Sequence, residues 1–159
     1  MSNIMLNLKE LLNPDSFLFI QDPTSKKMVF DKLCTEASEK YNIDKNLLLN
    51  NLIKREKIGT TTIGNGIAIP HVQNDQIIKP SCIVAILSEG LDFDALDNNP
   101  VDLIVFLILP EPSKPENLQI LAQISRLLRD TEITDKLRGC KSEESAFAII
   151  SQHLKNKAA

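Results

Sequence analysis

The sequence is poor in the residues that build metal and redox sites. It has three cysteines, two histidines and no tryptophan. Cys34, Cys82 and Cys140 lie far apart and form no Cys-x-x-Cys pair, which excludes a zinc knuckle and a thioredoxin-type redox motif. His71 and His153 each lack a second ligand at metal-binding spacing. We therefore expect no metal, no cofactor and reduced thiols, as in a cytoplasmic protein.

Long hydrophobic runs and a strong excess of one charge are absent as well. The longest uninterrupted apolar run, Leu103–Leu109, is far shorter than a membrane span, and Met1–Met5 has no signal-peptide character. With 18 Lys and Arg against 21 Asp and Glu, the net charge of −3 gives no electrostatic case for nucleic acid or an anionic membrane. These features predict a cytoplasmic protein that neither binds nucleic acid nor inserts into a membrane.

What the sequence does contain is the composition of one globular domain. Its 159 residues are 43% hydrophobic and 25% charged, which is close to the average for soluble domains. No repeat and no Gly/Ser linker interrupts them. We expect a single domain over residues 1–155 and a short polar C-terminal tail over residues 156–159.

The first half of the chain predicts a strand followed by two helices. Phe17–Ile20 is a short apolar run suited to a buried strand. A helix is expected behind Thr24, which we assign as its N-cap, because apolar residues then recur every four positions at Val29, Leu33, Ala37 and Tyr41. Asp44 is expected to cap a second helix, which ends in the cations Lys54, Arg55 and Lys57.

The second half predicts strands and then further helices. Residues 60–63 and 67–69 flank a glycine-rich turn, and the segments 82–87 and 101–109 are almost wholly apolar, which is typical of strands covered on both faces. Helical periodicity then returns at Leu118, Leu121, Ile124, Leu127 and Leu128, around residues 133–137, and from Ser142 to Leu154. This order predicts an α/β fold, a single compact domain whose mixed β-sheet of about five strands is flanked by helices on both faces.

The most informative stretch for function ends at His71. This histidine directly follows a buried-looking strand and a proline, Pro70, whose locked φ stiffens the backbone that enters it. Gly64, Gly66 and Ala68 just upstream leave room for another group to approach. A neutral imidazole is a nucleophile near pH 7 and can form a covalent intermediate. A structural or merely exposed histidine is the alternative that the residues alone leave open.

The seventeen residues from Arg55 to His71 resemble a known active-site segment. The stretch Arg-Glu-Lys-Ile-Gly-Thr-Thr-Thr-Ile-Gly-Asn-Gly-Ile-Ala-Ile-Pro-His is similar to that of the enzyme IIA domains of the bacterial phosphotransferase system. The resemblance is to the fructose/mannitol type (type 2), and most of all to its nitrogen-regulatory branch. It covers nearly the whole chain, through the segments 8–14, 93–95, 100–101, 107–110 and 118–128.

The resemblance implies roles for individual residues. His71 would accept a phosphoryl group from the phosphorylated histidine of a small phosphocarrier protein, and Arg55 would bind the phosphoryl oxygens. The hydroxyls of Thr60 and Thr61 would complete the phosphate cradle. Without the resemblance, Arg55 is interpreted as a solvated helix-end cation and the threonines as ordinary strand residues.

One position departs from the family pattern. A second histidine usually begins the helix after the proline-rich turn, and this sequence has Asn117 there. Asn can donate a neutral hydrogen bond to the phosphate but can neither carry charge nor take a proton. We expect Asn117 to support phosphate binding, or to serve only as a helix N-cap, or both. His153 is expected to be exposed and without function.

An acidic stretch precedes the second apolar strand. Glu89, Asp92, Asp94 and Asp97 surround Gly90, and we interpret them as a solvated loop between two buried strands. A contact with a partner protein is the alternative.

Three hypotheses for the function follow. The first is a phosphocarrier and regulatory protein, phosphorylated on His71 by a histidine phosphocarrier protein, whose phosphorylation state controls target proteins such as kinases or ion transporters. The second is a sugar-uptake enzyme IIA that passes the phosphate to a permease-linked IIB domain. The third is an interaction module without phosphoryl chemistry. In the first two cases the protein is a phosphotransferase component with a phosphohistidine intermediate rather than a free-standing turnover enzyme.

Overall fold

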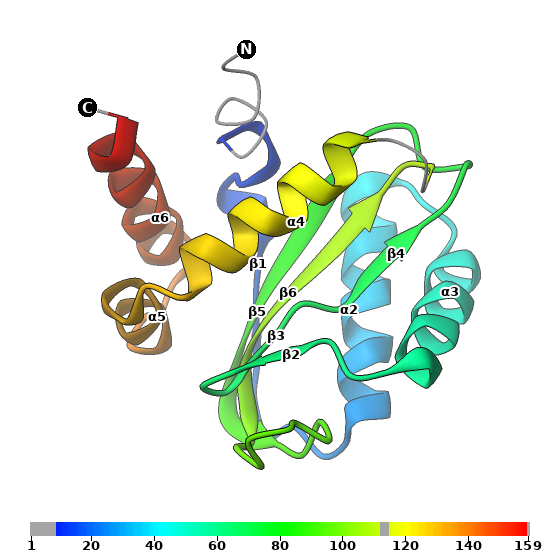
Figure 1. The fold of residues 1–159 in the computed structure, drawn as a ribbon, viewed down its shortest axis with the longest axis horizontal. Helices are drawn as coiled ribbons and strands as arrows, with labels where there is room; N and C mark the ends of the chain where they lie inside the picture. Colours follow the sequence, from blue (N-terminus) through cyan, green and yellow to red (C-terminus); the bar gives the residue numbers. More distant parts are fainter. Residues whose placement is uncertain (1–8, 112–114, 159) are drawn as a thin grey trace.

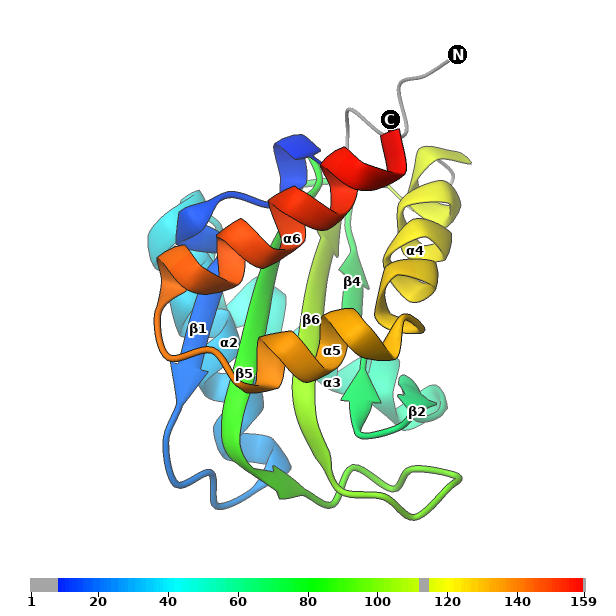
Figure 2. The ribbon, with the colours of Figure 1, turned by 90° about the vertical axis from the view of Figure 1, so that its left-hand side faces the viewer.

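A mixed sheet with helices on both faces forms the core of the protein. The structure is a computed structural model that describes residues 9–111 and 115–158. The sheet has six strands in the order β1-β5-β6-β3-β2, and β4 also pairs with β6. Helices α2 and α3 cover one face, and α4, α5 and α6 cover the other (Figures 1 and 2). The predicted α/β fold is confirmed, with one strand more than the expected five.

The strands differ strongly in length. The two long central strands pair antiparallel, and β1 runs parallel to β5. At the other edge, β3 and β4 pair with successive parts of β6 in parallel, Ile67 opposite Leu103 and His71 opposite Leu107. The strand bounds are β1 Phe17–Ile20, β2 Thr62–Gly64, β3 Ile67–Ala68, β4 His71–Gln73, β5 Ser81–Leu91 and β6 Val101–Leu109.

A 3-10 turn at Pro14–Ser16 precedes β1, and two helices follow this strand. Helix α2 spans Lys26–Tyr41 and α3 spans Lys45–Ile58. The N-cap of α3 is Asp44, as predicted, because its carboxylate accepts from the Leu47 backbone N–H at 2.9 Å. The prediction of Thr24 as the cap of α2 is wrong. The cap is Ser25, whose extended backbone lets its hydroxyl accept from the Met28 N–H.

Three helices follow β6, namely α4 Pro115–Leu128, α5 Thr131–Arg138 and α6 Glu143–Ala158. Helix α6 thus continues into residues that the sequence assigned to a C-terminal tail. On α4 the buried apolar residues are Ile120, Ile124, Leu127 and Leu128, whereas Leu118 is 71% exposed. The prediction that Leu118 lies on the apolar stripe is therefore wrong. The buried stripe contains the i, i+4 series Ile120, Ile124 and Leu128, and Leu118 lies outside it.

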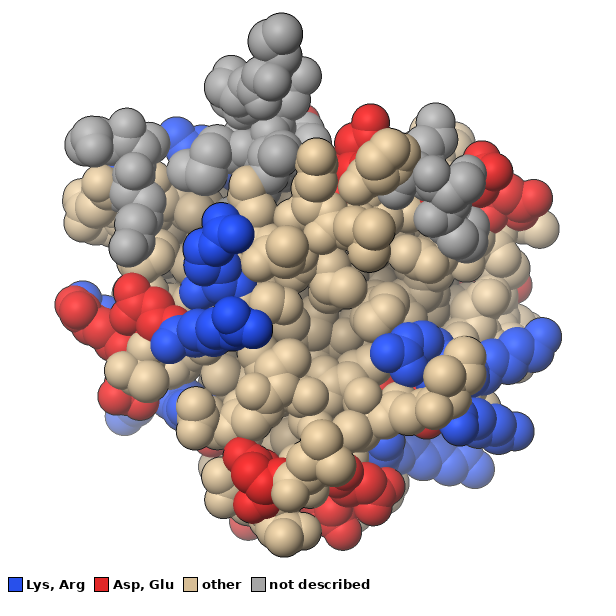
Figure 3. Space-filling view, viewed as in Figure 1, with Lys and Arg blue, Asp and Glu red and all other residues tan. Residues whose placement is uncertain are grey.

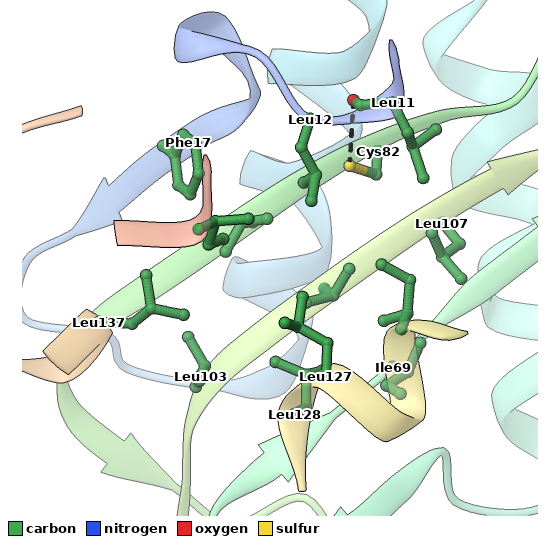
Figure 4. Packing of buried hydrophobic residues seen from close by; sticks show 14 of the residues in the cluster. Leu11, Leu12, Phe17, Ile69, Cys82, Leu103, Leu107, Leu127, Leu128 and Leu137 are labelled. Atoms are coloured by element: carbon green, nitrogen blue, oxygen red, sulfur yellow. Dashed lines mark hydrogen bonds between the residues drawn. The ribbon is translucent and has the colours of Figure 1, made fainter. Parts of the chain in front are cut away.

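The apolar strands bury both of their faces. Along β6, Leu103, Val105 and Leu107 belong to the cluster beneath α4, α5 and α6, while Ile104 and Phe106 belong to the cluster beneath α2 and α3. Figure 4 shows Leu103 and Leu107 of β6 among residues of the first cluster, with Leu127 and Leu128 of α4 and Leu137 of α5. Full burial of such a side chain is worth about 1.5–3 kcal/mol. The two cores fix the register of β6, and through it the position of β4.

The cysteines are free, and two of them lie in these cores. Burial raises the pKa of the Cys34 and Cys82 thiols to about 12, so neither is a reactive thiolate. Within residues 9–111 and 115–158, no helix combines the length and the hydrophobicity that crossing a bilayer would need.

Candidate functional site

A tight turn and a proline bring His71 to the edge of the sheet. Gly64, Asn65 and Gly66 all have positive φ and reverse the chain between β2 and β3. After β3 the chain passes Pro70, whose carbonyl accepts from the Leu107 N–H at 2.9 Å, and enters β4 at His71. Because Val72 packs into the core beneath α2 and α3, strand alternation directs His71 toward the opposite face, which α4 covers.

The surroundings of His71 define the state of its ring. Nδ1 lies 2.9 Å from the carbonyl oxygen of Ile69, and a carbonyl can only accept, so Nδ1 carries the proton. Nε2 accepts from Nε of Arg55 at 3.3 Å. Burial is the largest effect and lowers the pKa of His71 below its usual 6.5. The hydrogen bond to the Ile69 carbonyl raises the pKa, the Arg55 charge lowers it by less than that, and Glu56 raises it least. The ring is therefore a neutral imidazole with its Nε2 lone pair on the Arg55 side.

Arg55 reaches this ring from the last turn of α3, which packs beside β4. Its Nη1 also donates to the carbonyl of Gly59 at 3.0 Å, which orients the planar guanidinium. The half-buried cation thus lies at the nitrogen that has no proton. A guanidinium in this place is suited to bind an anion attached to Nε2.

The two threonines are placed close to Arg55 in sequence but do not bond to His71. Thr60 donates to the carbonyl of Phe93 at 3.2 Å, and Thr61 donates to Oε1 of Glu56 at 2.6 Å. Among the described residues, the hydroxyls of both threonines are thereby used inside the protein. They brace the segment that leads from α3 to β2.

Asn117 lies apart from this group as well. Its side chain is 1% exposed, and its Nδ2 donates to the carbonyls of Pro110 and Glu111 at 3.1 and 2.9 Å. The N-cap interpretation is wrong, because α4 begins at Pro115 and Asn117 lies inside its first turn. Within the described part of the chain, its Oδ1 is buried without a hydrogen-bond partner. The amide holds the chain where β6 ends.

Sequence reasoning missed Glu56, whose side chain is 7% exposed. Its Oε2 forms an ion pair of 2.7 Å with Nζ of Lys26, and its Oε1 accepts from Thr61. Lys26 also lies 5.2 Å from the ring centroid of Phe93. The place of Glu56 beside Arg55 was a signal in the sequence, whereas nothing there pointed to Lys26, which lies on another helix.

A second missed group holds the turn from the opposite side. Arg138 of α5 donates through Nε to Asp102 Oδ1 at 2.9 Å and through Nη2 to the carbonyl of Asn65. The N–H of Asn65 donates to Asp97 at 3.0 Å. Backbone hydrogen bonds from Asn99 and Asn65 lower the pKa of Asp97. The N–H and the carbonyl of Asn65, at the centre of the turn, are thus both hydrogen-bonded to side chains from other segments.

Two expectations about charged residues need correction. Asp92, Asp94 and Asp97 lie in an exposed loop after β5, as predicted, but Glu89 lies within β5 itself. The side chain of His153 is only 14% exposed, and its Nδ1 lies 3.8 Å from Asp130 Oδ2, so the expected exposure is wrong. The helix packing of α6 against α5 explains this burial.

The face of the molecule that carries α4, β3 and β4 has few charges in its middle. Figure 3 shows uncharged side chains there, Lys and Arg at both sides, and a group of Asp and Glu below, over the β5–β6 loop. Exposed large apolar residues include Ile63 of β2 at 40% and Leu118 of α4 at 71%. Such a face, apolar in the middle and charged at its rim, is typical of a protein-docking surface.

Comparison with known proteins agrees with the resemblance of the Arg55–His71 segment. The nitrogen regulatory protein of Pseudomonas aeruginosa is 37% identical over 147 residues, 92% of this chain and 96% of that protein. The fructose-specific EIIA component of Haloferax volcanii is 31% identical over 133 residues, 83% of this chain and 86% of that protein. The crystal structure of nitrogen regulatory protein IIA-Ntr from Neisseria meningitidis matches with a TM-score of 0.81 and 27% identity, covering 89% of this chain and 97% of that chain.

The family model of the phosphoenolpyruvate-dependent sugar phosphotransferase system EIIA 2 matches residues 10–153. This match contains every element of the sheet and the whole of the site around His71. The chain therefore belongs to the type 2 EIIA family of the phosphotransferase system.

Proposed function

We propose that this protein is a phosphocarrier and regulatory protein that accepts a phosphoryl group on His71 from a histidine-phosphorylated carrier protein. Its phosphorylation state then decides which target proteins, such as kinases or ion transporters, it binds. The observation that carries the proposal is the ring geometry. The Nδ1 proton is held by the Ile69 carbonyl at 2.9 Å, and Nε2 is left with its lone pair beside Arg55.

The transfer follows from this geometry. Nε2 of His71 attacks the phosphorus, a new N–P bond forms, and the N–P bond to the donor histidine breaks. The electron pair of that bond returns to the donor ring. The Ile69 carbonyl stabilises the positive charge that develops on the His71 ring. Arg55 moves its N–H groups from the ring nitrogen to the phosphoryl oxygens, since phosphoryl transfer depends mainly on such positioning and charge neutralisation.

The phosphorylated state differs from the free state in charge. A phosphoryl group adds close to two negative charges at neutral pH. It would place them beside Arg55, on a face whose middle carries few charges. Surfaces that bind the free form through apolar contacts are thereby repelled, and basic surfaces are attracted. This is the physical basis for regulation by phosphorylation state.

The experiment is phosphorylation of the full chain with enzyme I, the phosphocarrier protein and phosphoenolpyruvate, followed by mass spectrometry. We expect a gain of about 80 Da, one phosphoryl group. His71→Ala should abolish the gain and His153→Ala should leave it unchanged. A missing gain, or a gain that survives His71→Ala, would contradict the proposal and favour an interaction module without phosphoryl chemistry.

Arg55→Ala tests the second residue of the site. We expect slower labelling by at least about tenfold, because a charge-assisted hydrogen bond to a phosphoryl oxygen is worth about 1.5–3 kcal/mol. Lys54→Ala is the matched control, an exposed cation on the same helix, and should label at the normal rate. Unchanged labelling of Arg55→Ala would remove this residue from the site.

A sugar-uptake role is the second candidate, favoured by the similarity to the fructose-specific EIIA component of Haloferax volcanii. The two roles differ in where the phosphoryl group goes. Incubation of the phosphorylated protein with a panel of sugar-specific IIB domains separates them. Rapid transfer to one of these domains would replace the regulatory role by the transport role.

A further inference from the structure

A cavity of about 310 Å³ lies between α2 and α3, and the chemistry assigned to His71 does not use it. Its apolar part is formed by Phe30 of α2 and by Leu49 and Ile53 of α3. Ile53 is 38% exposed, so part of its apolar surface is open at the cavity. The volume falls at the lower end of the range for small-molecule sites.

The charged groups around this cavity leave an unbalanced positive charge. Both carboxylates of its lining are already paired, Glu56 with Lys26 at 2.7 Å and Asp31 with Lys45 at 2.9 Å. Two further lining cations, Lys27 and Lys57, form no ion pair within the described residues. The cavity therefore combines an apolar floor with two unpaired ammonium groups, which is complementary to an anion that has an apolar body.

We propose that this cavity binds a small organic carboxylate with an apolar body. The apolar body would lie against Phe30, Leu49 and Ile53, and the carboxylate would bind the ammonium groups of Lys27 and Lys57. Flexible lysine stems allow these groups to reach a ligand while they remain in contact with water. A neutral ligand of the same shape would gain only the apolar contacts, and a cation would be repelled.

The cavity is connected to the surroundings of His71 through Glu56. One oxygen of this carboxylate pairs with Lys26 at the cavity, and the other accepts from Thr61 at 2.6 Å. A ligand carboxylate held by Lys27 and Lys57 lies in the same lining as the Lys26–Glu56 ion pair, so its negative charge acts on that pair and changes the bond between Glu56 and Thr61. Arg55 directly precedes Glu56 in the last turn of α3, and its Nε lies 3.3 Å from Nε2 of His71. Binding should therefore shift the NMR signals of Thr61 and His71, whether or not the protein carries phosphate.

The test is an NMR titration of the full unphosphorylated chain with 3-phenylpropionate. We expect saturating shifts of the Leu49 and Ile53 methyl signals with a dissociation constant on the order of 1 mM or below. Smaller shifts should appear at the Thr61 amide and the His71 ring. The neutral 3-phenylpropanol should bind at least about tenfold more weakly, since it lacks the charge-assisted contacts. Equal binding of the alcohol, or no saturating shifts, would overturn the proposal.

Variants separate the cavity from general charge effects. Lys27→Gln combined with Lys57→Gln should weaken 3-phenylpropionate binding by about tenfold or more. Lys32→Gln combined with Lys54→Gln removes two exposed lysines of the same helices that do not line the cavity, and binding should remain unchanged. Equal loss in both double variants would show a nonspecific charge effect and contradict the site. Shifts at the cavity without any at Thr61 or His71 would contradict the connection to the ring.

Discussion

The imidazole of His71 is kept neutral by burial and by the guanidinium beside it. Its pKa lies below 6.5, so the nucleophilic form persists as the pH falls to that value and is lost only at lower pH. The folded state prefers the neutral ring, and the stability that this preference contributes is present above pH 6.5 and declines as the pH falls through the lowered pKa.

Arg55→Gln gives this prediction a direct measurement. Removing the positive charge should raise the pKa of His71 relative to the wild-type protein, while burial still holds it below 6.5. The pKa is read from the ring protons in an NMR titration. Lys54→Gln serves as the control and should leave the titration unchanged. An unchanged or lower pKa in Arg55→Gln would show that the guanidinium does not act on the ring.

Asn117 holds the backbone where β6 ends, and its support of phosphate binding stays a prediction. Asn117→Ala removes the two donors that bind the Pro110 and Glu111 carbonyls, and we expect a loss of about 1–3 kcal/mol in the free energy of unfolding. Urea unfolding measures this loss. Gln119→Ala, an exposed residue of the same helix, should change the stability by less than about 0.5 kcal/mol. Equal stability of the two variants would contradict the structural role.

The glycine-rich turn is the element that sets where β3, and therefore His71, lies. Gly66 has φ +78, and a Cβ there would lie 2.9 Å from Nη2 of Arg138 and 3.1 Å from the Pro100 carbonyl. Gly66→Ala should destabilise the protein by about 2–4 kcal/mol through the left-handed backbone and the contacts together. It should also disturb the His71 ring signals.

Gly59 provides the matched control for this turn. Its φ of 165 is extended backbone open to any residue, and a Cβ there would meet nothing within 4 Å. Gly59→Ala should therefore keep the stability within about 0.5 kcal/mol of wild type. If thermal unfolding gave similar losses for both variants, the turn would not depend on a glycine at position 66.

How much of these elements the sequence predicts depends on how local their causes are. The helices, β1, β5 and β6 follow from apolar periodicity and from caps such as Asp44. The sequence pattern does not predict strand β4, because its three residues are too few to show a periodicity and its pairing with β6 is long-range. The exposure of Leu118 was missed for the same reason, since only the packing of α4 on the sheet decides which residues face inward.

The candidate site shows the same limit. The His71 and Arg55 pair lies within one continuous segment of family resemblance, and the structure places the two side chains 3.3 Å apart. Lys26 and Arg138 come from helices far away in sequence and act by tertiary contacts that no local pattern reports. The structure shows Thr61 bonded to Glu56 and Asn117 bonded to the Pro110 carbonyl, partners that the sequence pattern does not identify, and the part of both residues in phosphate binding stays a prediction.

At the scale of the molecule, His71 lies where two layers meet. Strand β4 pairs only with β6 among the described strands, so the histidine lies at an edge that α3 reaches with Arg55. Because Val72 packs beneath α2 and α3, the ring is directed to the face covered by α4, and Ile63 of β2 and Leu118 of α4 are exposed. Under the proposed function, a phosphorylated donor protein would approach the edge and this face together, so that docking and chemistry would use different residues.

This separation leads to a prediction that distinguishes docking from chemistry. Leu118→Asp introduces a charge into the uncharged face without touching the His71 ring or its two hydrogen bonds. We expect phosphoryl transfer from the carrier protein to slow by at least about tenfold, since desolvating an unpaired carboxylate at an interface core is costly. Labelling by phosphoramidate, a donor too small to need a docking surface, should stay at the wild-type rate.

Ile78→Asp is the control for this experiment. Ile78 is 94% exposed, but it borders the connection between α2 and α3, next to Tyr41 and Asn42. A new charge there should leave transfer from the carrier unchanged, because Ile78 borders the α2–α3 connection and is not part of α4 or β2. If Leu118→Asp slowed phosphoramidate labelling equally, the substitution would have disturbed the ring itself. If it slowed neither reaction, the donor would dock elsewhere, and the route to Nε2 would have to run along the α3 edge alone.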